Sequence, residues 1–356
     1  MFYFVFIICL ITILLMWLKK YKAAKILAII LLFSFAIIMS LSKDLGIDYS
    51  TYKYNYDINY YYMIFSPKEF IWSILFIVSK FFNLDFVFLM MIVKLLTVSF
   101  FYLGLKNLKL NDFSMAVAII CYILIPSITF LNIVRQGLAI SIFFYAFSFI
   151  NKGNLNKYTL WSLVAFFIHS SILIVFLIVL SFYYFNLKKY KLLRFRYLII
   201  IELSVFIFVI LLILFKDFFG ELFTYFLSIF AYNYDLQLNQ LSLNDLFAPI
   251  VISNSILITF VIYTEMKDNC LSITQLLCFF GILLNIASIT SYLFDRVGIL
   301  FSSFNPYLIS ILANDSDTNI IKNNLIYLVL AFYCVCYILN VFINGEANNL
   351  QYIFYF

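Results

Sequence analysis

The sequence predicts an all-α polytopic membrane protein with about 10–12 transmembrane or half-membrane helices. Of its 356 residues, 66% are hydrophobic and 11% are charged, whereas soluble domains hold about 45–50% apolar and about 25% charged residues. The mean hydropathy is +1.07. Many apolar runs approach the ~20 residues that a helix needs to cross a bilayer. We expect one integral membrane domain over residues 1–356, with outer loops near 42–68 and 215–248.

The apolar runs define the expected spans in order. They cover residues 2–18, 26–41, 84–105, 113–131, 133–150, 197–214, 249–264, 272–293, 297–313 and 324–344. Two further stretches fit a single span poorly. Residues 69–82 are short and end in Glu69 and Lys80, and residues 158–185 are too long and hold His169 near their middle. We expect the first to lie along the outer interface and the second to form two short helices that meet at His169.

Basic residues predict the orientation, because cytoplasmic loops carry an excess of Lys and Arg. The densest basic connectors are KKYKAAK at 19–25 and NLKKYKLLRFR at 186–196. With the arrangement above, 15 Lys and Arg lie inside and seven outside, and Lys94 stays within a helix. If 69–82 crossed the membrane and 158–185 crossed once, the split would be 13 against nine. The first arrangement is preferred, and it places the unusual polar residues on the outer face.

Several function classes lack their motifs. The sequence has no Walker loop, no GxGxxG and no DxD motif, so ATP- or nucleotide-sugar-driven chemistry is unsupported. The basic residues separate apolar runs, which suits orientation and not nucleic-acid binding. The six cysteines have no metal-ligand spacing, and carboxylates near arginines give no argument for a bound metal. We expect no metal and no cofactor.

The first loop combines tyrosines with carboxylates. Seven tyrosines lie between Tyr49 and Tyr62, interleaved with Asp44, Asp48 and Asp57. Such rings suit a membrane-interface belt or stacking against sugars. A belt does not need the carboxylates, which can accept hydrogen bonds from sugar hydroxyls or act as a base.

The segment NIVRQGLAISIFFYAF at 132–147 places Arg135 and Gln136 among apolar residues. An arginine at membrane depth is costly and is a functional hypothesis by default. Its planar fork suits a phosphate or a carboxylate. The alternative is that the apolar stem of Arg135 is buried while its guanidinium extends to the membrane interface. Gly137 permits close helix approach.

His169, in AFFIHSSIL at 165–173, is the only histidine. Imidazole takes up a proton near neutral pH, although a lone histidine in an apolar run is often a structural hydrogen-bonding group. Asp295 and Arg296 separate two apolar runs. Neighbours on a helix do not face each other, so each can serve a different ligand group. Residues 215–248 suit a lid, a glycan-contact surface or a plain connecting loop.

Three segments in this order resemble the EpsG-type polysaccharide polymerases, which are relatives of the Wzy O-antigen polymerases. They are GIDYSTYKY at 46–54, NIVRQGLAISIFFYAF at 132–147 and KYTLWSLVAFFIHSSILIV at 157–175. The resemblance covers the first half of the chain well. The Asp295–Arg296 element fits more loosely.

The resemblance implies a multi-pass enzyme of the bacterial cytoplasmic membrane with a GT-C-like polymerase architecture. Such an enzyme joins undecaprenyl-pyrophosphate-linked oligosaccharide repeats on the outer face, for O-antigen or exopolysaccharide synthesis. Arg135 and Arg296 are then candidates to stabilise the leaving pyrophosphate, and His169, followed by Asp48, to act as the base. Tyr49, Tyr52, Gln136 and Asp295 would contact substrate. Binding of a chain-length regulator stays open.

Two other membrane classes remain as alternatives. A flippase for lipid-linked oligosaccharides should line a lumen with basic residues, and only Lys94 is clearly within a span. A membrane acyltransferase that modifies surface sugars would also use a histidine, but one reachable from the cytoplasm. A purely structural protein has no need of Arg135, His169 and Arg296 on one face.

Overall fold

The computed structural model describes residues 2–43, 48–57, 70–184, 200, 203–204, 207, 249–265, 272–287, 292–314, 320–343 and 353–354. These residues are helical apart from turns and one short strand pair, in which Ser42 lies opposite Phe354 and Lys43 opposite Ile353. Five helical stretches are long and apolar enough to span a membrane, and several shorter apolar helices accompany them. The all-α polytopic prediction is therefore confirmed.

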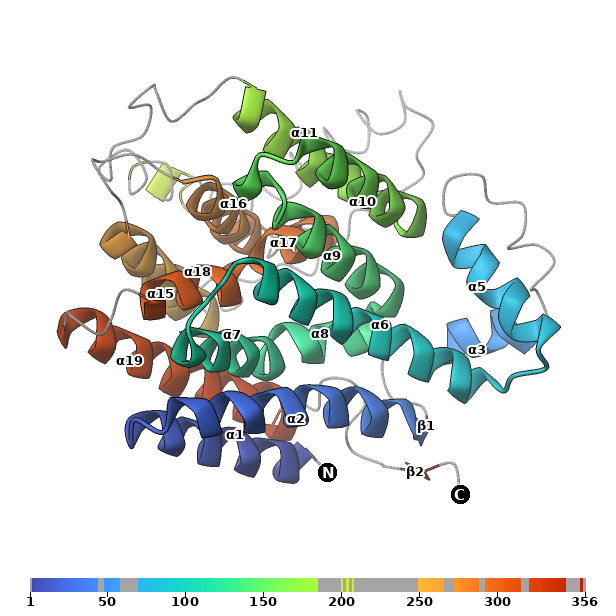
Figure 1. The fold of residues 1–356 in the computed structure, drawn as a ribbon, viewed down its shortest axis with the longest axis horizontal. Coiled ribbons are helices and arrows are strands. Elements are labelled where there is room, and N and C mark those ends of the chain that lie inside the picture. Colours follow the sequence, from blue (N-terminus) through green and yellow to red (C-terminus); the bar gives the residue numbers. More distant parts are fainter. Residues whose placement is uncertain are drawn as a thin grey trace. The chain divides into compact units, whose positions relative to one another are not determined.

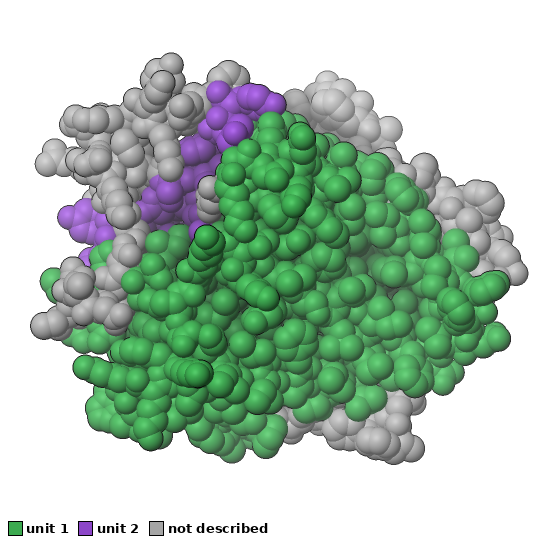
Figure 2. Space-filling view, viewed as in Figure 1, with its two compact units in different colours: residues 1–180, 309–356 green, residues 181–308 purple. Residues whose placement is uncertain are grey.

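The chain divides into two compact units, coloured separately in Figure 2. Unit 1 comprises residues 1–180 and 309–356, and unit 2 comprises residues 181–308. The N-terminal elements of the chain are α1 (Phe2–Trp17), α2 (Tyr21–Ser40), β1 (Ser42–Lys43), α3 (Tyr49–Asp57), α5 (Phe70–Phe81), α6 (Phe86–Asn107), α7 (Asp112–Leu124), α8 (Pro126–Asn132), α9 (Val134–Phe147), η1 (Ile150–Lys152), α10 (Leu155–Ile168) and α11 (Ile172–Tyr184). The later elements are α15 (Pro249–Glu265), α16 (Ile273–Ala287), α17 (Tyr292–Ser302), α18 (Asn305–Asn314), α19 (Ile320–Tyr337), η5 (Ile338–Ile343) and β2 (Ile353–Phe354).

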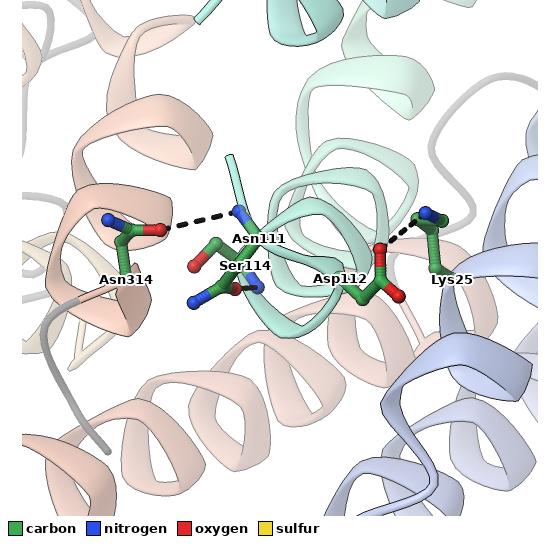
Figure 3. Close-up of polar contacts among 5 residues, drawn as sticks. All are labelled: Lys25, Asn111, Asp112, Ser114 and Asn314. Atoms are coloured by element: carbon green, nitrogen blue, oxygen red, sulfur yellow. Dashed lines mark hydrogen bonds and ion pairs between the residues drawn. The ribbon is translucent and has the colours of Figure 1, made fainter. Parts of the chain in front are cut away.

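Helix α7 forms the core of unit 1 (Figure 1). Every residue from Phe113 to Leu124 is buried, which is expected of a helix that is apolar on all sides. Its N-terminus is held by three polar contacts, shown in Figure 3. The Asn111 side chain accepts a hydrogen bond from the Ser114 N–H at 2.8 Å, Asp112 pairs with Lys25 of α2, and the Asn314 side chain accepts from the Asn111 N–H at 3.3 Å.

Side-chain contacts show that α2 and α6 are antiparallel. Phe33 packs against Tyr102 with ring centroids 6.1 Å apart, and Lys94 Nζ donates to the Met39 carbonyl at 2.8 Å. Residue numbers thus rise along α2 as they fall along α6. Between them, α5 has 12 residues, only about 18 Å of helix. This is the arrangement that the charge count prefers.

Several lysines meet at one end of unit 1, whereas Lys53 of α3 and Lys80 of α5 lie elsewhere. Asp112 pairs with Lys25, Asn107 Nδ2 donates to Ser148 Oγ at 3.0 Å, and Lys152 Nζ donates to Asn107 Oδ1 at 3.2 Å. We call this the basic end. It includes the starts of α2 and α7 and the ends of α6 and α9.

One expected span, 113–131, and the long stretch 158–185 are both interrupted helices. Proline lacks an N–H and keeps the preceding residue out of the α conformation. Ile125, before Pro126, has φ −127° and ψ −71°, so α7 ends there and α8 begins. The stretch 158–185 breaks at His169, whose backbone is extended at φ −151° and ψ 117°. Two short helices meeting at His169 are therefore confirmed.

Helices α6 and α9 approach closely at a glycine. A Cβ atom on Gly104 would lie 2.6 Å from Cδ1 of Phe144. The Phe144 ring stacks on Phe101, which stacks in turn on Tyr122 of α7 at 3.9 Å. With 45 Phe and only eight Gly, this chain uses a small residue where helices must meet and large rings to fill the rest.

We predict that Gly104→Ala destabilises the protein. Crowding a packed interface costs about 1–3 kcal/mol, more than the up to about 1 kcal/mol that alanine gains in helix propensity. The measurement is the thermal unfolding midpoint in detergent micelles. Leu103→Ala, on the neighbouring exposed position, is the control. Adding Phe144→Leu to Gly104→Ala should recover part of the loss, and a midpoint unchanged by Gly104→Ala would contradict the close approach.

Candidate functional site

The beginning of α9 is a helix N-terminus inside the apolar part of unit 1. Ile133 breaks the chain at φ −118° and ψ 54°, and the first turn closes with the Gly137 N–H donating to the Ile133 carbonyl at 2.8 Å. A Cβ on Gly137 would lie 2.8 Å from Cγ of Phe130. Glycine at 137 thus lets α8 fold against the first turn of α9, which is the close approach expected from the sequence.

Arg135 and Gln136 occupy this first turn. Gln136 is buried at 2% exposure, while Arg135 is half-buried with its Nε atom buried. The first N–H groups of a helix have no acceptor within the helix, and the helix dipole makes that end positive. A cation placed there raises the positive potential instead of balancing it. The arrangement suits an anion such as a phosphate group.

Antiparallel packing brings His169 to the same end as Arg135. The two helices are joined by the short connector 148–154, in which the Asn154 N–H donates to the Phe149 carbonyl at 3.1 Å, and Phe143 of α9 packs against Tyr158 of α10 with ring centroids 6.1 Å apart. Along this pair, α9 runs toward the basic end and α10 runs away from it. The start of α9 and the end of α10 therefore share the end of unit 1 opposite the basic end.

The His169 ring is held by the turn that follows it. Its Nδ1 lies 2.7 Å from Ser171 Oγ and 3.4 Å from the Ser171 N–H, which donates to it. The Ile172 N–H donates to the His169 carbonyl at 3.2 Å, so the turn leads directly into α11. These contacts with Ser171 fix the orientation of the imidazole ring.

Helix α3 lies at this end as well. Tyr49, Tyr52 and Tyr56 share one face, and their rings pack against Phe86, Trp72 and Phe76 at 5.3, 5.7 and 5.6 Å. Helix α5 then contacts the end of α10 through Phe70 and Phe167, 4.5 Å apart. Aromatic packing thus connects α3 to the turn at His169.

This packing buries Tyr49 and Tyr52 at 7% and 8% exposure. Their role in sugar contact stays a prediction. The exposed ring of α3 is Tyr54 at 55%, a residue that the sequence argument did not single out. The sequence did contain a signal for which tyrosines are buried. Tyr49, Tyr52 and Tyr56 are spaced by three and four residues, which places them on one face of a helix.

Asp48 directly precedes α3, and its carbonyl accepts from the Tyr52 N–H at 3.0 Å. A carboxylate at this position also stabilises a helix through the dipole. Its position thus has a structural explanation besides the base role expected from the sequence. Asp44 and the 215–248 segment lie outside the described residues.

Arg296 belongs to α17 of unit 2, together with Asp295, whose side chain lies outside the described part. Two glycines fix α17 against its neighbours. A Cβ on Gly298 would lie 2.9 Å from Asn285 Oδ1, and one on Gly281 would lie 2.9 Å from the Ser302 N atom. Arg296 is half-buried two residues before Gly298. The close packing of α16 therefore determines the position of Arg296 within unit 2.

Lys94 is a basic residue that the sequence argument left without a role. Its bond to Met39 places a cation at the last turn of α2, where the helix dipole favours it. It also lines a small cavity of about 30 Å³ beside Leu131 and Val134, next to the start of α9. Within the described ranges, no three His, Cys, Asp or Glu side chains group to hold a metal ion.

Comparison with known proteins bears on this arrangement. Neither the curated proteins nor the solved structures give a match, so the GT-C-like architecture stays a prediction. A family model described as the EpsG family matches residues 25–355. That range contains α9, the turn at His169, and α17. Because the match covers nearly the whole chain, the protein belongs to the EpsG family, whose members are membrane proteins of the polysaccharide polymerase type.

Proposed function

We propose that this protein polymerises undecaprenyl-pyrophosphate-linked oligosaccharide repeats on the outer face of the bacterial cytoplasmic membrane. Membership of the EpsG family supports a polymerase-type function. The observation that carries the rest is the end of unit 1 opposite the basic end, where the positive start of α9 and the His169 turn lie together. The positive-inside rule makes the basic end cytoplasmic, and the site then faces outward.

Arg135 and the first turn of α9 bind the diphosphate of the growing chain. Binding there orients the bond between the anomeric carbon and the diphosphate oxygen and stabilises the charge that develops on the leaving group. Arg296 of unit 2 is the second candidate cation, and Asp295 and Gln136 are candidate sugar contacts. Because the donor is already activated, the reaction needs no nucleotide.

His169 acts as the base for the acceptor hydroxyl, with Asp48 as the alternative. As the hydroxyl oxygen bonds to the anomeric carbon, its proton passes to Nε2 and undecaprenyl pyrophosphate leaves with the electron pair of the broken bond. This role requires the tautomer in which Nδ1 carries the ring proton and donates it to Ser171 Oγ, so that Nε2 is the acceptor; in that tautomer the Ser171 N–H does not donate to Nδ1. Ser171 is therefore a positioning residue. Tyr49 and Tyr52 hold α3 in place, and exposed Tyr54 is available for sugar contact.

Arg135→Lys should reduce polymer formation by about ten- to a hundredfold. Lysine keeps the charge but lacks the two-pronged geometry, and a lost charge-assisted hydrogen bond is worth about 1.5–3 kcal/mol. The readout is the glycan ladder on a gel, normalised to protein abundance in the membrane. Lys106→Gln changes an exposed lysine at the basic end and should leave the ladder normal. Equal losses in both variants would point to insertion or folding instead of catalysis.

His169→Gln should lower polymerisation by ~10²–10⁴-fold, the range for a positioned general base. Surface glycan would then carry single repeats. Ser171→Ala keeps the imidazole and should cost about tenfold, with the pH dependence of the rate shifted because the ring loses its partner. A near-normal ladder from His169→Gln would reject the base assignment, and Asp48→Asn would be the next variant to measure.

A further inference from the structure

A groove runs between α1 and α19 on the outside of unit 1. It is lined by Leu10, Ile13, Leu14 and Trp17 of α1 and by Asn324, Tyr327 and Leu328 of α19, and its volume is about 580 Å³. The residues from α1 repeat at helical spacing, so they form one continuous stripe. Leu14, Trp17 and Leu328 are 52%, 66% and 59% exposed. The groove therefore opens toward the lipid.

The polar mouth of this groove lies at the basic end. Helices α1 and α19 are antiparallel, because Tyr337 near the end of α19 stacks on Phe6 near the start of α1 at 5.5 Å, while Trp17 at the end of α1 lines the groove with Asn324 near the start of α19. The last turn of α1 therefore lies level with the first turn of α19. This brings Lys322 to the level of Lys19 and Lys20, beside Trp17.

Lys19 occupies a backbone position that glycine usually fills. Its φ is +58°, its N–H donates to the Met16 carbonyl, and the Lys20 N–H donates to the Leu15 carbonyl, both at 2.9 Å. This pair of bonds is the common helix ending with a left-handed residue, where a side chain adds strain. A lysine there adds a positive charge, but its side chain strains the left-handed backbone. Lys109, at the end of α6, has the same conformation with φ +56°.

We propose that the groove binds an anionic phospholipid of the bilayer. One acyl chain lies along the stripe from Leu10 to Leu14, and the phosphate lies at Lys19, Lys20 and Lys322. Three features support this occupant: the apolar outward-facing groove, the tryptophan at its mouth where headgroups begin, and the basic residues that complement an anionic headgroup. The groove mouth lies at the opposite end of unit 1 from Arg135 and His169, so this site is separate from the proposed polymerisation site.

The test is native mass spectrometry of the full-length protein, delipidated in detergent and titrated with phosphatidylglycerol or phosphatidylcholine. We expect phosphatidylglycerol to bind more tightly. Lys19→Gly and Lys322→Gln should each weaken it about fivefold, since a basic residue near an anionic surface is worth about that factor. Lys109→Gly is the matched control, because it makes the same change at the same backbone conformation outside the groove. It should bind like the wild type.

Two more variants separate this site from a folding defect and from another occupant. Lys19→Gly relieves the left-handed strain, so its lipid-free unfolding midpoint should not fall. Leu14→Trp fills the stripe and should weaken phosphatidylglycerol while every lysine remains. Equal binding of both lipids, equal effects of Lys19→Gly and Lys109→Gly, or no effect of Leu14→Trp would overturn the proposal. So would Leu14→Cys cross-linking two copies of the chain in membranes, which would show protein in the groove.

Discussion

The need to satisfy every backbone N–H and C=O group away from water determines where this structure can place a site. In the hydrocarbon core, a single segment can satisfy its own backbone hydrogen bonds only as a helix. An interruption is tolerated where protein or a water-filled cavity covers it. Unit 1 contains interruptions at Ile125, Ile133 and His169. The breaks at Ile133 and His169 place the start of α9 and the extended backbone of His169 at the same end of unit 1. Phe130 packs against the first turn of α9, and Phe70 packs against Phe167 beside the turn at His169, so protein side chains lie next to each break.

From the sequence, the direction of the helices is easier to predict than the residues at which they end. Counting lysines selects an arrangement in which α2 and α6 are antiparallel, and the Lys94–Met39 and Phe33–Tyr102 contacts agree. The break at His169 is also foreseeable, because 158–185 is too long for one span and has a polar residue near its middle. Pro126 signals the break at Ile125. The expected spans also divide between 131 and 133, but how closely α8 and α9 meet at Ile133 depends on packing of Phe130 against Gly137.

Contacts between distant residues account for what the sequence does not predict at the site. Tyr49 and Tyr52 look available in a polar loop, and only the positions of Phe86 and Trp72 bury them. The partner of Lys94 lies 55 residues away, so its attachment to the end of α2 cannot be deduced from its own surroundings. Arg296 depends on two glycines that let α17 meet its neighbours, a fit that residue types alone do not specify.

The lengths of the helices also bear on the bilayer around the protein. Helix α2 has 20 residues and α6 has 22, whereas α10 has 14 and α11 has 13, equivalent to about 30 and 33 Å against about 21 and 20 Å. Both short helices expose leucines, so lipid next to them meets an apolar surface thinner than a ~30 Å hydrocarbon core. Hydrophobic mismatch of this size thins the bilayer locally or admits water. In the function proposed above, a lipid-linked glycan that arrives on that side lowers its diphosphate toward the start of α9 while its sugars stay hydrated.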